Sequence, residues 1–543
     1  MRRLLFLCLL VMTVGGFARA ADLPAVKSVI PCEALAKQDL AVAVGAPVKI
    51  GKISTIGAFC RVEGSIAPEI SFEVNLPVEG WQQRYLQTGC GGLCGMLSTH
   101  LDHAGTCAPA QQAGLVVASD DMGHRGMGAD FGADPQKRID FAYRGNHLTA
   151  LAAKALIKAF YGQAPKYSYF AGCSDGGREA LVEAERYPED FNGITAGAPA
   201  LNFQVQNSFY HAWQTVSNTG PDGKAILVAD RLPILHKAVL AACDKLDGDE
   251  DGLIADPRAC HFDPATLQCK AGEKDTAACL SEAEVTVARR FYQGPVDAAG
   301  HHFTVGGPQY GSELSWAGVY VPRSPDEPIF SRMIASGSSQ FVIFPEISPA
   351  DGDVAHFVFT QANFARLRAL HPLYDGGDTD LGRFDKAGGK LILWHGWSDP
   401  HISPINTIAY YQGVAAKLGR DETTSFTRLF LFPGMYHCGG GEGYTQFDML
   451  SAIIDWVENR KAPDTITAAQ IAPVDRGGPP PMGPRTNPPP LPEPDQPALK
   501  TRAIKAYALE DKPQTYEWEG ADLIGPDFQK VYAVKDGKLV GSN

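Results

Sequence analysis

The chain has 543 residues, of which 45% are hydrophobic and 20% charged, as in an ordinary globular protein. This length exceeds the range over which one hydrophobic core keeps growing, so we expect more than one domain. The formal net charge is −13, and no cluster of Lys and Arg interrupts the acidic excess. We therefore expect neither nucleic acid nor an anionic membrane as a partner.

Residues 1–20 have the pattern of a Sec signal peptide. Arg2 and Arg3 precede an apolar run over residues 4–14, and residues 18–20 form a small-x-small cleavage site. The apolar run is shorter than the roughly 20 residues that a membrane anchor needs, and no later stretch could span a bilayer. The sequence predicts an exported protein, in the periplasm or the medium, whose mature charge is −16 because cleavage removes three arginines and no acid.

Export places the cysteines in an oxidising compartment, where disulfides persist. Of the twelve cysteines, Cys8 lies in the signal peptide, and the odd remainder predicts one free thiol. Proximity in the sequence favours Cys243–Cys260 and Cys269–Cys279 as disulfides. The sequence leaves open the pairing of five others: Cys32, Cys60, Cys90, Cys94 and Cys107.

Strand-like and helix-like runs alternate from about residue 81 to 200. Alternation of this kind predicts an α/β fold with a parallel sheet. The rhythm stops after about residue 202 and resumes at residue 390. The predicted strands are 115–119, 167–171, 193–198, 390–394 and 428–432, and the predicted helices are 147–161, 178–186 and 447–459.

The break in this rhythm predicts an inserted domain at residues 202–385, which are rich in turns, aspartates and aromatic residues. The core then consists of two parts, residues 21–201 and 386–476. Residues 477–543 form a proline-rich segment and a C-terminal extension. The proline-dense stretch at residues 477–498 cannot pack as regular structure, so we expect it to run along the surface.

Ser174 is the predicted nucleophile. Residues 172–176 read Gly-Cys-Ser-Asp-Gly, the Gly-x-Ser-x-Gly pattern of the nucleophile elbow in α/β-hydrolases. The motif follows a predicted strand directly and precedes a helix, as the elbow requires. A tight turn with an idle serine is the alternative, because such a motif arises easily in a chain with 57 glycines.

A serine nucleophile needs a base, and the base needs a carboxylate that orients it. In α/β-hydrolases these follow in the order Ser, Asp, His, each in a loop after a strand. Asp399 follows the strand at 390–394, and His437 follows the strand at 428–432. We therefore predict that Asp399 and His437 complete a triad with Ser174.

Cys173 precedes the predicted nucleophile, and Cys438 follows the predicted base. A disulfide between them would tie the two catalytic loops together. The oxyanion hole of such an enzyme needs two backbone N–H groups. We predict that Asp175 supplies one and Gly91, in the glycine-rich loop at residues 89–92, the other; a plain flexible turn is the alternative for that loop.

Five acidic residues fall within residues 243–253 of the insertion. Calcium takes six to eight oxygen ligands, and closely spaced aspartates supply them. Asp247, Asp249 and Asp251 mimic the start of an EF-hand, but Arg258 stands where a bidentate glutamate is needed. The pattern predicts another kind of structural calcium loop, closed by Cys243–Cys260, with a solvated acidic turn as the alternative.

The chain resembles the tannase and feruloyl esterase family of α/β-hydrolases, which also includes a hydrolase of mono(2-hydroxyethyl) terephthalate. The resemblance rests on residues 172–177, 395–400 and 436–439, and extends to the glycine-rich and acidic loops. It implies an α/β-hydrolase fold with a large inserted lid domain. It also implies a calcium ion held by three side chains and two carbonyl groups, those of Asp244, Asp247 and Asp251, and of Asp249 and Leu253.

The resemblance implies an exported serine esterase that cleaves feruloyl, other hydroxycinnamoyl or galloyl esters, with a small aromatic ester as its partner. A terephthalate monoester hydrolase or an acyltransferase of the same family is an alternative. An alternative of another class is a calcium-dependent binding protein on a hydrolase scaffold. The candidates for aromatic walls of the acyl pocket are Trp316, Phe341, Phe344, Phe357 and Phe359. The acyl group, the alcohol and the oligomeric state are left open.

Overall fold

The structure is a computed structural model that describes residues 23–273, 276–472, 490–509 and 531–542. The predicted signal peptide lies outside these ranges. Within them, no helix combines the length and the apolar character that crossing a membrane requires.

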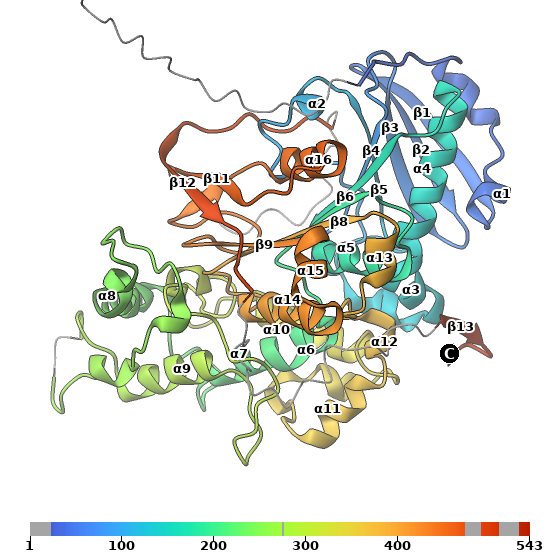
Figure 1. The fold of residues 1–543 in the computed structure, drawn as a ribbon. Helices are drawn as coiled ribbons and strands as arrows, with labels where there is room; N and C mark the ends of the chain where they lie inside the picture. Colours follow the sequence, from blue (N-terminus) through green and yellow to red (C-terminus); the bar gives the residue numbers. More distant parts are fainter. Residues whose placement is uncertain (1–22, 274–275, 473–489, 510–530, 543) are drawn as a thin grey trace, which may run out of the picture.

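A nine-stranded sheet forms the centre of the molecule (Figure 1), in the order β1-β2-β3-β5-β4-β6-β7-β8-β9. The first three strands are antiparallel, and the six from β5 to β9 are parallel. The predicted α/β-hydrolase fold is confirmed. The strands are β1 (Val48–Ile56), β2 (Phe59–Ile66), β3 (Ile70–Pro77), β4 (Arg84–Thr88), β5 (Leu115–Asp120), β6 (Tyr167–Cys173), β7 (Gly193–Gly197), β8 (Lys390–Gly396) and β9 (Thr427–Phe432).

Helices cover both faces of the sheet, so the core has three layers. On one face, α4 (Gly145–Tyr161) and α14 (Pro404–Leu418) bury apolar side chains against the strands. On the other face, α16 (Met449–Asn459) packs on β7 and β8 and shares an apolar cluster with side chains of β6 and β9. Alternate side chains of a strand point to opposite faces of the sheet. Because helices cover both faces, the side chains on both sides of these buried strands are apolar. Two shorter helices, α13 (Gly382–Lys386) and α15 (Arg420–Phe426), complete the first layer.

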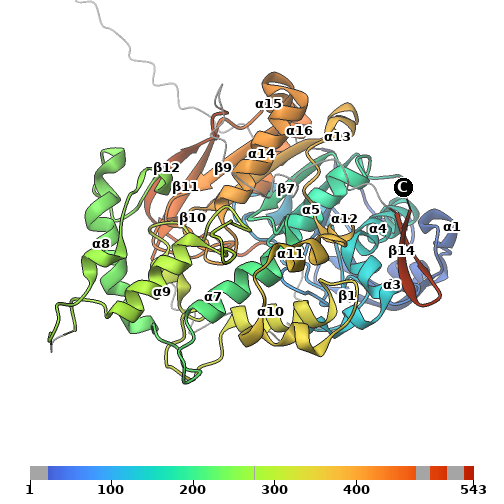
Figure 2. The same cartoon turned by 90° about the horizontal axis from the view of Figure 1, so that it is seen from below.

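Between β7 and β8 the described residues form helices, turns and isolated bridges, but no extended strand. We call this segment, residues 198–273 and 276–389, the lid. Apart from α13 near its end, it lies below the sheet, green to yellow in Figure 1, and its helices follow one another along one side in Figure 2. It has its own apolar core around Trp316 and Phe291. The main helices are α7 (His211–Ser217), α8 (Leu232–Cys243), α9 (Glu282–Gln293), α10 (Phe330–Phe341) and α11 (Gln361–Arg368).

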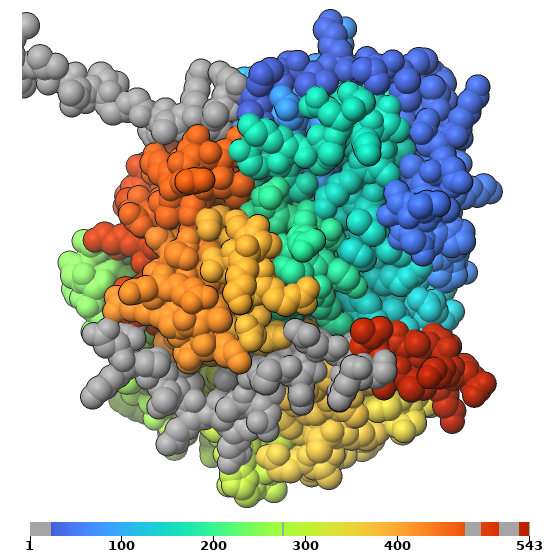
Figure 3. Space-filling view, turned by 45° about the vertical axis from the view of Figure 1, so that its right-hand side comes forward, coloured from blue at the N-terminus to red at the C-terminus, as the bar shows by residue number. Residues whose placement is uncertain are grey.

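The C-terminal part of the chain returns to the core in two places. β12 (Ala498–Lys505) pairs with β11 (Thr465–Ile471), which in turn pairs with β10 (Tyr444–Gln446). β13 (Val531–Lys535) and β14 (Lys538–Ser542) form a hairpin that Figure 3 shows in red against the cyan part of the surface. The backbone of Tyr532 hydrogen-bonds the hydroxyl of Tyr143. The proline-dense residues 477–489 lie outside the described residues.

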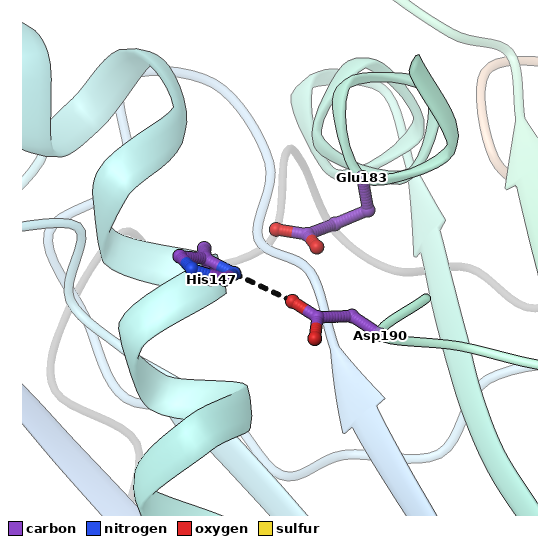
Figure 4. Close-up of side chains that lie close together, drawn as sticks. All are labelled: His147, Glu183 and Asp190. Atoms are coloured by element: carbon purple, nitrogen blue, oxygen red, sulfur yellow. Dashed lines mark hydrogen bonds and ion pairs between the residues drawn. The ribbon is translucent and has the colours of Figure 1, made fainter. Parts of the chain in front are cut away.

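A buried polar cluster joins α4 to the end of α5 (Asp175–Arg186), the helix that begins directly after Ser174 (Figure 4). His147 Nδ1 lies 2.6 Å from Asp190 Oδ2, and Lys154 donates to the side chain and the carbonyl of Asp190. The carboxylate of Glu183 points at this pair. His147, Glu183 and Asp190 offer metal-type ligand atoms within 4.8 Å of one another, but the ammonium group of Lys154 already supplies a cation beside Asp190.

Candidate active site

Ser174 occupies a sharp turn between β6 and α5. Its φ angle is +65° with ψ at −122°, a conformation that non-glycine residues rarely adopt. Such strain costs about 1–3 kcal/mol and persists only where the surrounding structure enforces it. Close backbone contacts enforce it here, because a Cβ atom on Gly172 would collide with the carbonyl of Gly176, and one on Gly177 with that of Gly197. The turn therefore requires its glycines.

His437 lies between Ser174 and Asp399. Its Nε2 atom is 2.8 Å from Ser174 Oγ, and its Nδ1 atom is 2.7 Å from Asp399 Oδ2. An ionised carboxylate only accepts hydrogen bonds, so Nδ1 carries the proton and Nε2 is left to accept from the serine hydroxyl. The three residues, which come from three separate loops at the carboxyl ends of β6, β8 and β9, form the chain of contacts that Ser-His-Asp catalysis uses.

Asp399 is fully buried and remains ionised. Burial alone would raise its pKa, but the charge of His437 and hydrogen bonds from His395 and His437 outweigh burial and hold the pKa well below its usual range. Its Oδ1 atom accepts the backbone N–H groups of His401 and Ile402, at 2.8 and 3.0 Å. The carboxylate is thus fixed in position and in charge.

His395 is a second histidine on Asp399 that the sequence did not single out. Its Nε2 atom is 3.0 Å from Asp399 Oδ2 and 3.1 Å from the Ile402 carbonyl, and its Nδ1 atom is 2.8 Å from Thr407 Oγ1. Donation from Nε2 to Asp399 orients the carboxylate that in turn orients His437. The sequence signals that could have found it are its place four residues before Asp399, at the end of β8, and its position at the start of the stretch 395–400 that carries the family resemblance.

Cys173 and Cys438 form a disulfide with their Cα atoms 5.9 Å apart. It joins the residue before Ser174 to the residue after His437. The carbonyl of Cys438 also lies 3.0 Å from His103 Nε2, and the ring of His103 stacks on Phe447 at 4.0 Å. The disulfide and the contact with His103 therefore both restrain the loop that carries His437.

Backbone N–H groups that could stabilise an oxyanion lie beside Ser174. Asp175 is the first residue of α5, where N–H groups have no partner within the helix. Its side chain turns away and forms a two-point ion pair with Arg178, at 2.6 and 2.9 Å. A Cβ atom on Gly91 would lie 3.9 Å from Ser174 Cβ, so this loop approaches the nucleophile closely.

Two further histidines and an aromatic ring lie beside His437 on the lid side. The ring centroid of His401 is 4.7 Å from that of His437, and Phe330, the first residue of α10, packs edge-on against His401 at 4.8 Å. His211 lies 5.9 Å from His401. Burial, followed by the charge of His437, lowers the pKa of His211 to about 3, and that of His401 also falls well below its usual value, so both rings are neutral.

The aromatic residues proposed from the sequence as pocket walls lie elsewhere. Trp316 is fully buried in the core of the lid, against Phe291 and Tyr320. Phe344 is also buried, and the rings of Phe357 and Phe359 pack on Phe209. Phe341 packs against the cluster around Phe131 and Val342. Phe330 instead contacts both His401 and His211, and no sequence pattern distinguished it.

The structure pairs the cysteines that the sequence left open. Cys32 bonds to Cys60, and Cys90 bonds to Cys94 within the glycine-rich loop. Disulfides also join the two predicted pairs in the lid, Cys243–Cys260 and Cys269–Cys279. Among the described residues, Cys107 is the free thiol, and it is buried.

The acidic loop of the lid places its carboxylates around one turn. Asp244 accepts the N–H of Gly252, and Arg502 lies 3.7 Å from both Asp247 and Asp251. Carboxylate oxygens are the donors that calcium prefers, so the chemistry of this set fits the ion. Among the described residues, however, the carboxylate oxygens of Asp244, Asp247 and Asp251 do not all lie within 4.8 Å of one another. A bound calcium ion would have to draw them together and compete with Arg502.

Comparison with known proteins decides the family. The family model described as "Tannase and feruloyl esterase" matches residues 53–522, which is most of the chain. The chain belongs to the tannase and feruloyl esterase family. It is therefore a carboxylic ester hydrolase of this type, which confirms the assignment as an enzyme and sets aside the alternative of a binding protein.

Curated relatives of the family agree with this placement. The chain is 33% identical over 483 residues to the mono(2-hydroxyethyl) terephthalate hydrolase of Piscinibacter sakaiensis, covering 75% of this chain and 78% of the relative. It is 33% identical over 439 residues to a probable feruloyl esterase B of Aspergillus clavatus, covering 76% and 79% of the two chains.

Solved structures share the fold. Feruloyl esterase B from Aspergillus oryzae superposes with a TM-score of 0.71 at 26% identity, covering 85% of this chain and 92% of the other. The tannin acyl hydrolase of Aspergillus niger superposes with a TM-score of 0.64 at 20% identity, covering 87% and 92%. The latter similarity concerns the fold alone.

Proposed function

We propose that the tannase-family chain hydrolyses esters of aromatic acids through an acyl-enzyme on Ser174. The observation that carries the proposal is the pair of contacts made by His437, 2.8 Å to Ser174 Oγ and 2.7 Å to Asp399 Oδ2. Few arrangements other than a nucleophile, its base and an orienting carboxylate bring these three groups together on three separate loops.

In the acylation step, Ser174 Oγ attacks the ester carbonyl carbon while His437 Nε2 takes the hydroxyl proton. Asp399 stabilises the imidazolium that forms, and its low pKa keeps it from taking the proton itself. The N–H groups of Asp175 and Gly91 stabilise the oxyanion. His437 then protonates the departing alcohol, which leaves the acyl group on Ser174.

In the deacylation step, water attacks the acyl carbonyl while His437 accepts a proton from it. Collapse of the second tetrahedral intermediate returns that proton to Ser174 and releases the acid. Replacing Ser174 by alanine should lower turnover of methyl ferulate by several orders of magnitude. Ser425→Ala, an exposed serine on α15, is the matched control and should retain full activity. Turnover by Ser174→Ala at the wild-type rate would refute the mechanism.

The proposed acyl group is a hydroxycinnamate or gallate. Its support is the feruloyl esterase relatives and the position of Phe330 against His401, whose ring lies 4.7 Å from that of His437. The terephthalate monoester hydrolase among the relatives favours a second candidate. A panel of methyl ferulate, chlorogenate, methyl gallate and mono(2-hydroxyethyl) terephthalate separates the two, since kcat/KM for the preferred acyl group should exceed the others by at least tenfold. Adding an alcohol acceptor tests for acyl transfer.

We also propose that the protein is exported after cleavage near Ala20. The support is the signal-like N-terminus and the five disulfides of the described residues, which persist in oxidising compartments. N-terminal sequencing of protein from the periplasm and the medium should find a chain that begins near residue 21. Retention in the cytoplasm with an intact N-terminus would contradict this.

The calcium ion remains a proposal. Asp244, Asp247 and Asp251 would hold it with their side chains, and Asp249 and Leu253 with their carbonyls. Its role would be to stabilise the lid. Chelation should lower the melting temperature and leave the chemistry at Ser174 unaltered at low temperature. Arg502→Gln removes the competing cation and should tighten calcium binding several-fold in titration calorimetry; no heat of binding in either protein would rule out the site.

A further inference from the structure

The loop from Gly89 to Gly95 carries one of the proposed oxyanion donors and contains its own disulfide, Cys90–Cys94. The disulfide closes a ring around residues 91–93, and its Cα atoms lie 5.8 Å apart. Gly91, inside this ring, is the part of the loop that approaches Ser174, with a Cβ position 3.9 Å from Ser174 Cβ. The backbone that would face the reacting carbonyl is therefore part of this covalent ring.

The two ends of this loop are anchored to the core. Gly89 donates its N–H to the Ala171 carbonyl at 2.9 Å, and Cys90 N lies 3.3 Å from the carboxylate of Glu179, which is buried. At the other end, the Leu93 carbonyl lies 2.9 Å from His124 Nε2, and the Gly95 carbonyl accepts from the N–H of Gly126.

The middle of the loop lacks such anchors. Within the described residues, neither Gly91 nor Gly92 donates its N–H to an acceptor. Gly92 has a φ angle of +70°, and Gly91 is exposed. Two adjacent glycines have more backbone freedom than any other dipeptide, and an N–H group aimed at an oxyanion must be fixed before the substrate arrives. Something other than hydrogen bonds must hold this segment.

We propose that the Cys90–Cys94 disulfide is the positioning element that fixes the Gly91 N–H toward the oxyanion. The inference rests on the proposed acyl-enzyme mechanism. Cys94 is fully buried and serves as the fixed end, while Cys90 lies next to the exposed Gly91 and carries the constraint to it. The cysteines act through the backbone of Gly91 and do not touch the substrate.

The expected effect falls on the transition state. Loss of a single oxyanion donor lowers kcat by about 10²–10³-fold, and a displaced donor loses part of that contribution. We therefore expect the double variant Cys90→Ser/Cys94→Ser to lower kcat for methyl ferulate by about tenfold while KM changes by less than twofold. A boronic acid analogue, which forms a tetrahedral adduct on serine, should bind about tenfold more weakly. Binding of the product ferulate should not change.

The control is Cys269→Ser/Cys279→Ser, which removes another short-range disulfide, with a sequence separation of 10, from the lid. It should leave kcat and boronate binding within twofold of the wild-type values. A Cys90→Ser/Cys94→Ser protein that is folded and has the wild-type kcat and boronate affinity would overturn the proposal. Equal losses of boronate and ferulate binding would also overturn it, because they indicate general damage to the site.

A second experiment tests the proposal on the wild-type protein, in case Cys90→Ser/Cys94→Ser does not fold. Wild-type protein is treated with a dithiol, whose two electrons reduce the Cys90–Cys94 bond to two thiols as the reagent becomes a cyclic disulfide. Differential alkylation identifies molecules reduced at this loop alone. Their kcat should fall about tenfold and recover on reoxidation; an unchanged kcat contradicts the proposal. If a serine-directed probe fails to label wild-type protein at all, the acyl-enzyme mechanism fails and this proposal with it, whereas normal labelling with an unchanged kcat rejects only the role of the disulfide.

Discussion

Cys173 and Cys438 are bonded to each other across 265 residues of sequence, and each is the immediate neighbour of a residue of the proposed triad. The bond spans the two loops at the ends of β6 and β9, between which β7 and β8 intervene in the sheet. It therefore connects parts of the core that no single strand pair holds together. Its position couples the stability of the fold to the distance between Ser174 and His437.

Removing this disulfide should affect both properties. In the chain-entropy model, a closure of 265 residues stabilises the fold by about 5.6 kcal/mol, against about 2.7 kcal/mol for the 10-residue closure of Cys269–Cys279. Cys173→Ser/Cys438→Ser should therefore lower the melting temperature more than Cys269→Ser/Cys279→Ser does. It should also lower kcat, which the control should not. Calorimetry and steady-state kinetics measure the two effects, and a variant with wild-type kcat would show that the bond is only structural.

Asp399→Asn should lower kcat by about 10⁴-fold with little change in KM. An amide can donate to His437 Nδ1, which would place the imidazole proton on Nε2 and prevent it from accepting the serine proton. Asp421→Asn, an exposed position on α15, is the control. Kinetics on methyl ferulate measure the loss. A loss below tenfold would mean that His395 or another group can orient His437 without this carboxylate.

Phe330→Ala should weaken the binding of aromatic esters. The ring lies beside the proposed site, 4.8 Å from His401, and an aromatic contact between Phe330 and the acyl ring would contribute roughly 0.5–1.5 kcal/mol beyond its buried area. We expect KM for methyl ferulate to rise several-fold, with kcat/KM for p-nitrophenyl acetate within twofold. Phe359→Ala, whose ring packs on Phe209 and Trp213, is the matched control. Equal effects of the two variants would place the acyl pocket elsewhere.

Asp120→Asn should stabilise the protein at neutral and alkaline pH. Burial raises the pKa of Asp120 from 3.8 to about 7, and the charges of Asp121 and Asp140 act in the same direction. Because the folded state holds this proton more tightly, the wild-type protein loses stability as the pH rises from about 4 to about 7. The asparagine keeps the acceptor for the Met122 N–H and removes the titration.

Thermal melts across this range measure the effect of Asp120→Asn. The difference in melting temperature between the variant and the wild type should grow from pH 4 to pH 7 and stay constant above that. Asp222→Asn, on an exposed turn of the lid, provides a comparison that should show no such trend. A constant difference at every pH would mean that Asp120 is ionised throughout.

The sequence predicted the triad because each member depends on local features. Ser174 stands in a motif between a strand and a helix, and Asp399 and His437 follow apolar runs that could only be buried strands. The carboxyl ends of parallel strands meet at one edge of a sheet, so the order of the loops was enough to bring the three residues together. The start of α5 was predicted three residues too late, because Asp175 and its two following glycines lack helix-favouring side chains.

The surroundings of the triad could not be predicted in this way. His401, His211 and Phe330 meet only after α7 and α10 fold over the core, and no period or spacing links them in the sequence. The pairing of Cys90 with Cys94 was also open, since five cysteines in that part of the chain allow many combinations. Two of the aromatic residues chosen as pocket walls, Trp316 and Phe344, are instead buried in the lid, because bulk and apolarity indicate burial in general and the lid has its own core to fill.

The most direct test of the account is where a fluorophosphonate probe reacts. The probe should label the wild-type protein once, and peptide mapping should find the adduct on Ser174, because His437 activates that hydroxyl alone. Ser174→Ala should remain unlabelled and inactive on methyl ferulate while keeping the wild-type melting behaviour. An adduct on another serine, or ester hydrolysis by a folded Ser174→Ala protein, would contradict the central claim.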